Sequence, residues 1–170
     1  MRFDLADHFL CSICGKEHQG PVTDWAYKLP DAVWALPDEE RAEKAKFTED
    51  LCQLGERYFI RGILPIPLIG TSDDFAWGAW AEVKWPIFQQ YLKLFDKDGS
   101  AEPRVEGLLA NKLPGYANSI AMPILIQFED PKSRPSMHCR AEDKSRLARE
   151  QRAGIDQARY HEILEAISIR

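Results

Sequence analysis

The residues best suited to chemistry lie near the start of the chain, in a cysteine pair followed by a histidine. Cys11 and Cys14 are separated by two residues, and Gly15 and His18 follow them. Two thiolates at this spacing can bind one metal ion when the chain turns tightly, and glycine permits such a turn. The pattern predicts a zinc knuckle within residues 8–24, with zinc as a structural cofactor and His18 as the third ligand.

A closed zinc site needs a further ligand from elsewhere in the chain. Cys52 is the first candidate, because it directly precedes a predicted strand, where a loop could carry it to the knuckle. Cys139, His8 and His138 are the remaining candidates. The predicted metal-ligating residues are Cys11, Cys14, His18 and Cys52.

Three other interpretations of the cysteine pair stay open. A thioredoxin-type redox motif needs a helix that begins at the first cysteine, and Gly15 with the polar residues behind it fits such a helix poorly. The thiols could also be remnants of a lost site, or small apolar core residues. Because four cysteines in 170 residues are too few for a disulfide scaffold, we expect a reducing compartment, the cytoplasm.

Other polar and aromatic candidates lie on or between two predicted strands. Asp73 and Asp74 could hold a cation, but they end a Gly-Thr-Ser-Asp-Asp run of turn-forming residues. Arg61 interrupts an apolar strand, and we expect it to pair with a carboxylate such as Glu82. Trp80 has the same strand parity as Glu82, so a ligand-binding role predicts that it is partly exposed beside Arg61 or Glu82.

The sheet that must position these residues is predicted by alternating hydrophobicity. Strands are expected over 57–69, 75–84 and 119–128, as neighbours in one sheet, because apolar residues recur at every second position. A short strand over 136–140 is a further candidate. The inward residues of the third strand are predicted to be Ile120, Met122, Ile124, Ile126 and Phe128.

Helices are predicted around this sheet. Pro37 and the acids behind it begin a helix that reaches residue 47, and Pro86 begins a second helix over 86–95. A short helix is expected within 105–118 and a last one over 155–167. The residues through which the second helix is expected to pack are Phe88, Leu92 and Phe95.

Strands gathered in the middle of the chain, with helices around them, predict an α+β fold with a mainly antiparallel sheet. A length of 170 residues fits a single domain. We expect residues 8–24 to form the knuckle and residues 25–170 to form the α+β body.

Charge and hydropathy restrict the partners. Acidic residues outnumber basic ones, 27 to 22, which gives a net charge of -5 and disfavours nucleic acid as a partner. No apolar run reaches the roughly 18 residues that a transmembrane helix needs, so no membrane association is expected. Asp4 and Asp7 interrupt the stretch that a secretion signal would occupy. A protein partner is left open.

Several short motifs follow one another in an order that resembles one bacterial family. In chain order they are Cys11-x-x-Cys14-Gly15-x-x-His18, Trp34-Ala-Leu-Pro37, Asp50-Leu-Cys52, Tyr58-Phe-Ile-Arg-Gly-Ile-Leu-Pro-Ile-Pro67, Phe75-Ala-Trp-Gly-Ala-Trp80, Asn111-Lys-Leu-Pro-Gly-Tyr116 and Leu147-Ala-Arg-Glu-Gln-Arg-Ala-Gly-Ile155. Together, over roughly residues 9–167, they resemble the family named domain of unknown function 2199 (DUF2199). The resemblance implies a single-domain prokaryotic protein and supplies no catalytic residues.

No motif of a known reaction occurs, so no catalytic residue is predicted. We expect a small bacterial binding or interaction protein with a structural zinc site. One alternative is a metal-dependent hydrolase in which Cys11, Cys14 and His18 leave a coordination position open and Glu17 acts as the base. A second alternative is an acidic, immunity-type protein that binds a basic partner.

Overall fold

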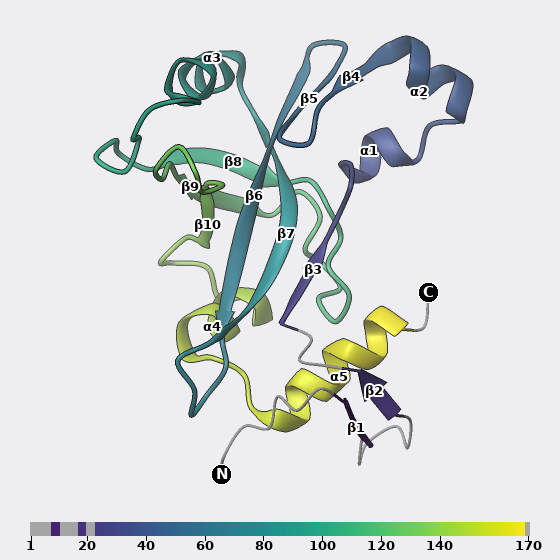
Figure 1. Ribbon diagram of the computed structural model, residues 1–170, viewed down its shortest axis with the longest axis vertical. Coiled ribbons are helices and arrows are strands. Elements are labelled where there is room, and N and C mark those ends of the chain that lie inside the picture. Colours follow the sequence, from purple (N-terminus) through teal and green to yellow (C-terminus); the bar gives the residue numbers. More distant parts are fainter. Residues whose placement is uncertain (1–7, 11–16, 20–22, 169–170) are drawn as a thin grey trace.

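The computed structural model describes residues 8–10, 17–19 and 23–168, the first two segments by their backbone (Figure 1). Helices flank a sheet-rich core, which confirms the predicted α+β class. The described strands are β1 (His8–Leu10), β2 (Glu17–Gln19), β3 (Asp24–Ala26), β4 (Ala45–Phe47), β5 (Leu51–Leu54), β6 (Arg57–Pro67), β7 (Asp74–Val83), β8 (Val105–Leu109), β9 (Pro123–Gln127) and β10 (Ser136–Cys139). The described helices are α1 (Asp31–Trp34), α2 (Asp38–Lys44), α3 (Trp85–Leu94), α4 (Arg146–Ala153) and α5 (Gln157–Ser168).

Eight strands form one sheet that closes on itself. The order is β3-β7-β8-β9-β10-β6-β5-β4, and β6 also pairs with β7, so five strands make a closed ring. Most neighbours are antiparallel, whereas β3 with β7 and β10 with β6 are parallel. The predicted strands 57–69 and 75–84 are adjacent, as expected. The third predicted strand lies in the same sheet, but β8 and β10 separate it from the other two, which corrects the expectation of direct neighbours.

Two predicted features between residues 105 and 122 are wrong. Residues 105–109 form β8 rather than a short helix, and β8 fills the gap between β7 and β9 that ring closure requires. Ile120 is exposed rather than inward, because β9 begins only at Pro123. The residues before β9 form a turn in which Ala121 adopts a positive φ of 61°.

Helix α3 packs on the sheet through a narrower face than predicted. Phe88 and Tyr91 are buried, but Leu92 and Phe95 are each 44 % exposed. A helix that meets the sheet with one face buries only part of a broad apolar stripe. The helical stripe is therefore confirmed at Phe88 and wrong at Leu92 and Phe95.

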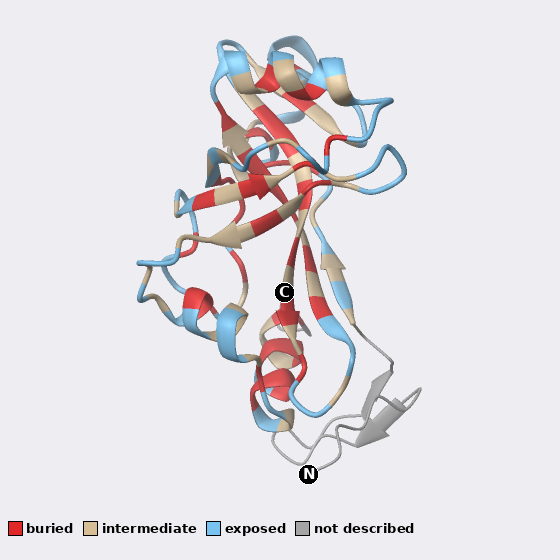
Figure 2. Ribbon diagram, turned by 90° about the vertical axis from the view of Figure 1, so that its left-hand side faces the viewer, coloured by how far each residue is buried: buried red, intermediate tan, exposed pale blue. Residues whose placement is uncertain are grey.

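The two faces of the β6–β7 pair lie in different cores. The main core fills the ring and continues onto α3, α4 and α5, and Figure 2 shows buried residues following the long strands and α5. The second core covers the opposite face and is closed by α1, β4 and β5. The buried residues of the second core are Leu29, Val33, Ala45, Cys52, Phe59, Trp80 and Ala110.

Candidate ligand-binding site

The predicted zinc ligands fall partly outside the described residues. Cys11 and Cys14 lie outside them, and for His18 only the backbone in β2 is described. Cys52 is 1 % exposed within the second core, where burial raises the pKa of its thiol to about 11. β2 and β5 lie at opposite ends of the molecule in Figure 1, so the structure does not bring the backbone of His18 close to Cys52.

No group of three or more metal-ligating side chains gathers within the part of the chain that the structure describes. The zinc site at Cys11 and Cys14 stays a prediction.

The expected partner of Arg61 and the expected exposure of Trp80 are not those that the structure shows, although Trp80 does lie beside Arg61. Glu82 forms its ion pair with Arg57, at 2.7 Å between Oε1 and Nη2. Trp80 is fully buried in the second core, and its indole N–H donates to the Tyr27 carbonyl at 3.1 Å. The ligand-lining role for Trp80 is therefore wrong. Trp80 points to the face of the β6–β7 pair opposite the main core, and α1, β4 and β5 cover that face.

The Asp73–Asp74 pair belongs to a turn between β6 and β7. Thr71 Oγ1 accepts a hydrogen bond from the Asp73 backbone N–H at 3.0 Å and donates to the Leu68 carbonyl at 2.9 Å. Such side-chain hydrogen bonds to the local backbone are typical of turn residues.

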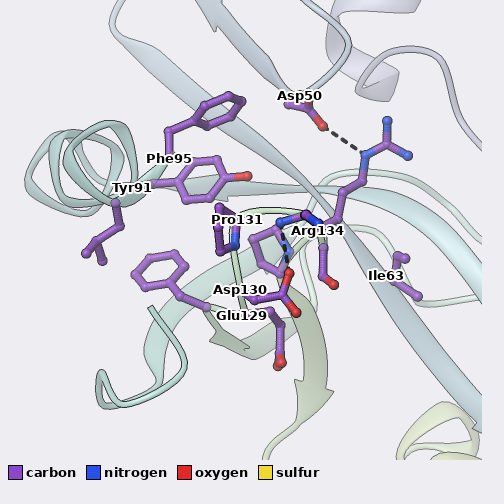
Figure 3. A pocket seen from close by; sticks show the side chains of 13 residues that line it. Asp50, Ile63, Tyr91, Phe95, Glu129, Asp130, Pro131 and Arg134 are labelled. Atoms are coloured by element: carbon purple, nitrogen blue, oxygen red, sulfur yellow. Dashed lines mark hydrogen bonds and ion pairs between the residues drawn. The ribbon is translucent and has the colours of Figure 1, made fainter. Parts of the chain in front are cut away.

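A hollow lies elsewhere, between α3, β6 and the loop that joins β9 to β10 (Figure 3). Its volume is about 570 Å³. Its lining residues are Asp50, Ile63, Tyr91, Leu94, Phe95, Phe128, Glu129, Asp130, Pro131, Lys132, Ser133, Arg134 and Pro135. We call this space the α3 hollow.

One wall of the α3 hollow is aromatic. Tyr91 stacks on Phe128 with ring centroids 5.5 Å apart, and it meets Phe95 edge to face at 5.6 Å. Burial raises the pKa of Tyr91 to about 12, so its phenol is neutral at ordinary pH. The hydroxyl makes no hydrogen bond with any described residue and points into the hollow in Figure 3. This wall offers ring surfaces and one free hydroxyl.

The opposite wall carries charge. Arg134 Nε donates to Asp50 Oδ1 at 2.9 Å, and the side chains of Arg134 and Asp50 are 36 % and 29 % exposed. Arg61 lies close by on β6, and its backbone N–H donates to the Asp50 carbonyl at 3.0 Å. Burial, and then the charge of Arg134, lower the pKa of Arg61, whereas Asp50 and Glu49 raise it. The Asp50 carboxylate thus contacts the Arg134 guanidinium directly and acts on Arg61 only through its charge.

The acids of the β9–β10 loop are occupied by the loop itself. Asp130 Oδ1 accepts from the Lys132 backbone N–H at 2.8 Å. Glu129 Oε1 accepts from Ser136 Oγ at 3.0 Å, and the same hydroxyl lies 2.9 Å from His138 Nε2. In a catalytic triad the carboxylate contacts the histidine and leaves the serine as nucleophile. Here the serine stands between the other two, which favours a structural role.

Sequence reasoning missed Tyr91, Phe95 and Arg134 as site residues. Tyr91 and Phe95 belong to an apolar helical stripe, which is typical of core residues. Arg134 stands in a proline-flanked loop without a motif, and its partner Asp50 lies 84 residues away in the chain. Only Arg61, as a charge within an apolar strand, gave a sequence signal near this site.

Comparisons with known proteins identify a family and no activity. A family model described as "Uncharacterized protein conserved in bacteria (DUF2199)" matches residues 10–155. No curated protein and no solved structure matches the chain. Among the described helices, none has both the length and the apolar composition that crossing a membrane requires.

Proposed function

Because the chain belongs to the DUF2199 family, whose description names no activity, we propose a function from the geometry. The protein is a binding protein, and the α3 hollow holds the aromatic or otherwise apolar part of a small molecule. The observation that carries this proposal is a hollow of about 570 Å³ with three aromatic side chains on one wall and charged groups on the other. Small-molecule pockets commonly have volumes of about 300–1,000 Å³ and a few placed polar groups in an apolar lining.

The exposure of Phe95 supports the same proposal. Phe95 is 44 % exposed although its ring lies against that of the buried Tyr91. A ring at the mouth of a hollow gains buried apolar area when a ligand covers it, and it adds ring stacking. The carboxylates of the lining already accept hydrogen bonds from the protein, and this favours binding over proton transfer.

One residue within α3 and one residue at its C-terminal end provide a matched test of ligand binding in the hollow. Leu92 and Phe95 are equally exposed, but only Phe95 lines the hollow. With 2-phenylethanol as a neutral aromatic probe, saturation-transfer NMR should detect binding to the wild type and to Leu92→Ala. Phe95→Ala should weaken this binding by about tenfold, the equivalent of about 1.4 kcal/mol of lost apolar contact. Equal binding by both variants would place the probe elsewhere and overturn the proposal.

We also propose a structural zinc ion at Cys11 and Cys14, with His18 as a further ligand, in a cytoplasmic protein. The donor set and its spacing support this proposal. Purified protein should contain about one zinc per chain, and chelation should lower its melting temperature. Cys11→Ser should abolish the zinc content, whereas Cys139→Ser should keep it. Metal-free wild-type protein with an unchanged melting temperature after chelation would contradict the proposal.

A further inference from the structure

The Tyr91 hydroxyl is a polar group that the protein encloses and does not use. Tyr91 is 8 % exposed, and its ring stacks on Phe128 and meets Phe95 edge to face. Its hydroxyl makes no hydrogen bond with the described residues, and it points into the α3 hollow in Figure 3. A phenol can both donate and accept a hydrogen bond, and an enclosed polar group without a partner is costly. The partner of this hydroxyl is therefore what occupies the hollow.

The ring contacts of Tyr91 do not require a tyrosine. A phenylalanine would make the same stacking contact with Phe128 and the same edge-to-face contact with Phe95, and it would enclose no polar atom. Tyr91 lies on the buried face of α3, where an apolar side chain is the ordinary occupant. A hydroxyl at this position thus points to hydrogen bonding with a ligand rather than to packing.

The charged groups of the hollow restrict the charge of that ligand. The lining has three carboxylates, Asp50, Glu129 and Asp130, and two cations, Lys132 and Arg134. An anion would therefore meet an excess of negative charge. Each carboxylate already accepts a hydrogen bond from the protein, and Lys132 is exposed to solvent. A charged ligand group would lose hydration that these occupied groups do not replace, which favours an uncharged group.

The Asp50–Arg134 pair lies on the other side of the hollow from Tyr91 (Figure 3). Burial is the main cause of the raised pKa of Tyr91, the charge of Asp50 adds to it, and the charge of Arg134 opposes it. The pair uses Asp50 Oδ1 and Arg134 Nε, so Asp50 Oδ2 and the two Nη atoms make no hydrogen bond with described residues. Both walls thus offer donors and acceptors, which suits a ligand group that itself donates and accepts.

We propose that Tyr91 is the specificity-determining residue of the α3 hollow and that its hydroxyl binds an uncharged hydroxyl or carboxamide group of the ligand. This inference rests on the proposed function and narrows the ligand class to small uncharged aromatic alcohols and amides. Phe95 is 44 % exposed and lies nearer to solvent than Tyr91. The ring of the ligand therefore covers Phe95, and its polar group points inward to Tyr91.

The test compares 2-phenylethanol with ethylbenzene, which has a hydrogen atom in place of the hydroxyl group. Saturation-transfer NMR titration at pH 7 measures how each variant changes the affinity for each probe. Tyr91→Phe should weaken the binding of 2-phenylethanol about fivefold, the effect of one lost neutral hydrogen bond, and leave that of ethylbenzene unchanged. Phe95→Ala should weaken both probes alike, because it removes a ring contact. Tyr58→Phe is the matched control and should change neither affinity, because Tyr58 packs against Phe88 of α3 and does not line the hollow.

Charged analogues give a second readout that needs no variant. Phenylacetate and 2-phenylethylammonium carry the same ring, and each should bind the wild type several-fold more weakly than 2-phenylethanol. An ion that binds as tightly as the alcohol, or more tightly, would overturn the uncharged ligand class. Equal weakening of 2-phenylethanol and ethylbenzene by Tyr91→Phe, or no weakening of 2-phenylethanol, would overturn the role of Tyr91 and leave the aromatic hollow standing. Failure of all four probes to bind would overturn the proposed function together with this inference.

Discussion

Two arginine–carboxylate pairs in this protein use the same chemistry in opposite ways. In the first, Arg159 donates to both oxygens of Glu150, at 2.9 and 3.1 Å, and also to the Gly115 carbonyl and to Glu162. Its side chain and that of Glu150 are 10 % and 14 % exposed. In the second, Arg134 makes a single hydrogen bond to Asp50, and both side chains are about a third exposed.

The difference separates a structural pair from one suited to binding. Glu150 also accepts from the Tyr116 hydroxyl at 2.7 Å and from Arg146 Nε at 3.1 Å, so the cluster joins α4, α5 and the turn at Gly115. No nitrogen of Arg159 is left for a ligand. The Arg134 pair joins a loop to the residue before β5 and keeps its Nη atoms free of described partners.

The largest expected effect comes from breaking the buried pair. Glu150→Gln should lower the free energy of unfolding by about 3–5 kcal/mol, because it leaves the buried Arg159 with only the half-exposed Glu162 as a carboxylate partner. Glu106→Gln removes the exposed partner of Arg140 and should cost less than about 1 kcal/mol. Urea unfolding monitored by circular dichroism measures both. Equal losses of unfolding free energy would show that the buried and the exposed pair do not differ in their contribution to stability.

A smaller effect should appear at alkaline pH through the buried tyrosines of the two regions. Burial raises the pKa of Tyr91 from 10.0 to about 12, and burial with the Glu150 contact raises that of Tyr116 further. Between pH 10 and 12 the unfolded chain therefore loses phenol protons that the folded chain keeps. Each tyrosine should lower the stability by about 1.4 kcal/mol per pH unit in that range.

Tyr91→Phe isolates one of these contributions. Because the variant has one fewer phenol to titrate, its free energy of unfolding should fall less steeply with pH between pH 10 and 12, by the contribution of one proton. Its stability at pH 7 should change little, since the Tyr91 hydroxyl has no described partner. Tyr116→Phe should already cost about 1–2 kcal/mol at pH 7, because Glu150 loses a donor. Urea unfolding at pH 7 and 10.5 distinguishes them. An unchanged alkaline slope in Tyr91→Phe would contradict the assignment.

The smallest effect is expected at the exposed pair. Asp50→Asn should change the free energy of unfolding by less than about 1 kcal/mol, because a partly solvated ion pair contributes little. The same urea titration serves as the measurement. A loss as large as that of Glu150→Gln would make the Asp50–Arg134 pair structural and would remove the distinction between the two regions.

The local alternation of polar and apolar residues was sufficient to predict part of the fold. The alternation from Phe75 to Val83 predicted β7 and the residues that it buries, and the same argument gave β6 and the inner part of β9. The period of two in a strand fixes the face on which each side chain lies, and this information is local. The hydrophobic pattern did not predict α4, because its exposed face is strongly polar. The helix has a capping residue, since Ser145 Oγ accepts a hydrogen bond from the Ala148 N–H.

Tertiary structure decided what covers each face and which distant groups meet. Parity correctly put Trp80 on the face opposite the main core, but only the packing of α1, β4 and β5 made that face a second core. Phe88 and Phe95 share one helical stripe, yet packing on the sheet buries the first and leaves the second, at the end of α3, beside a hollow. The Arg134–Asp50 contact spans 84 residues and depends on closure of the ring, which spacing along a single element does not encode.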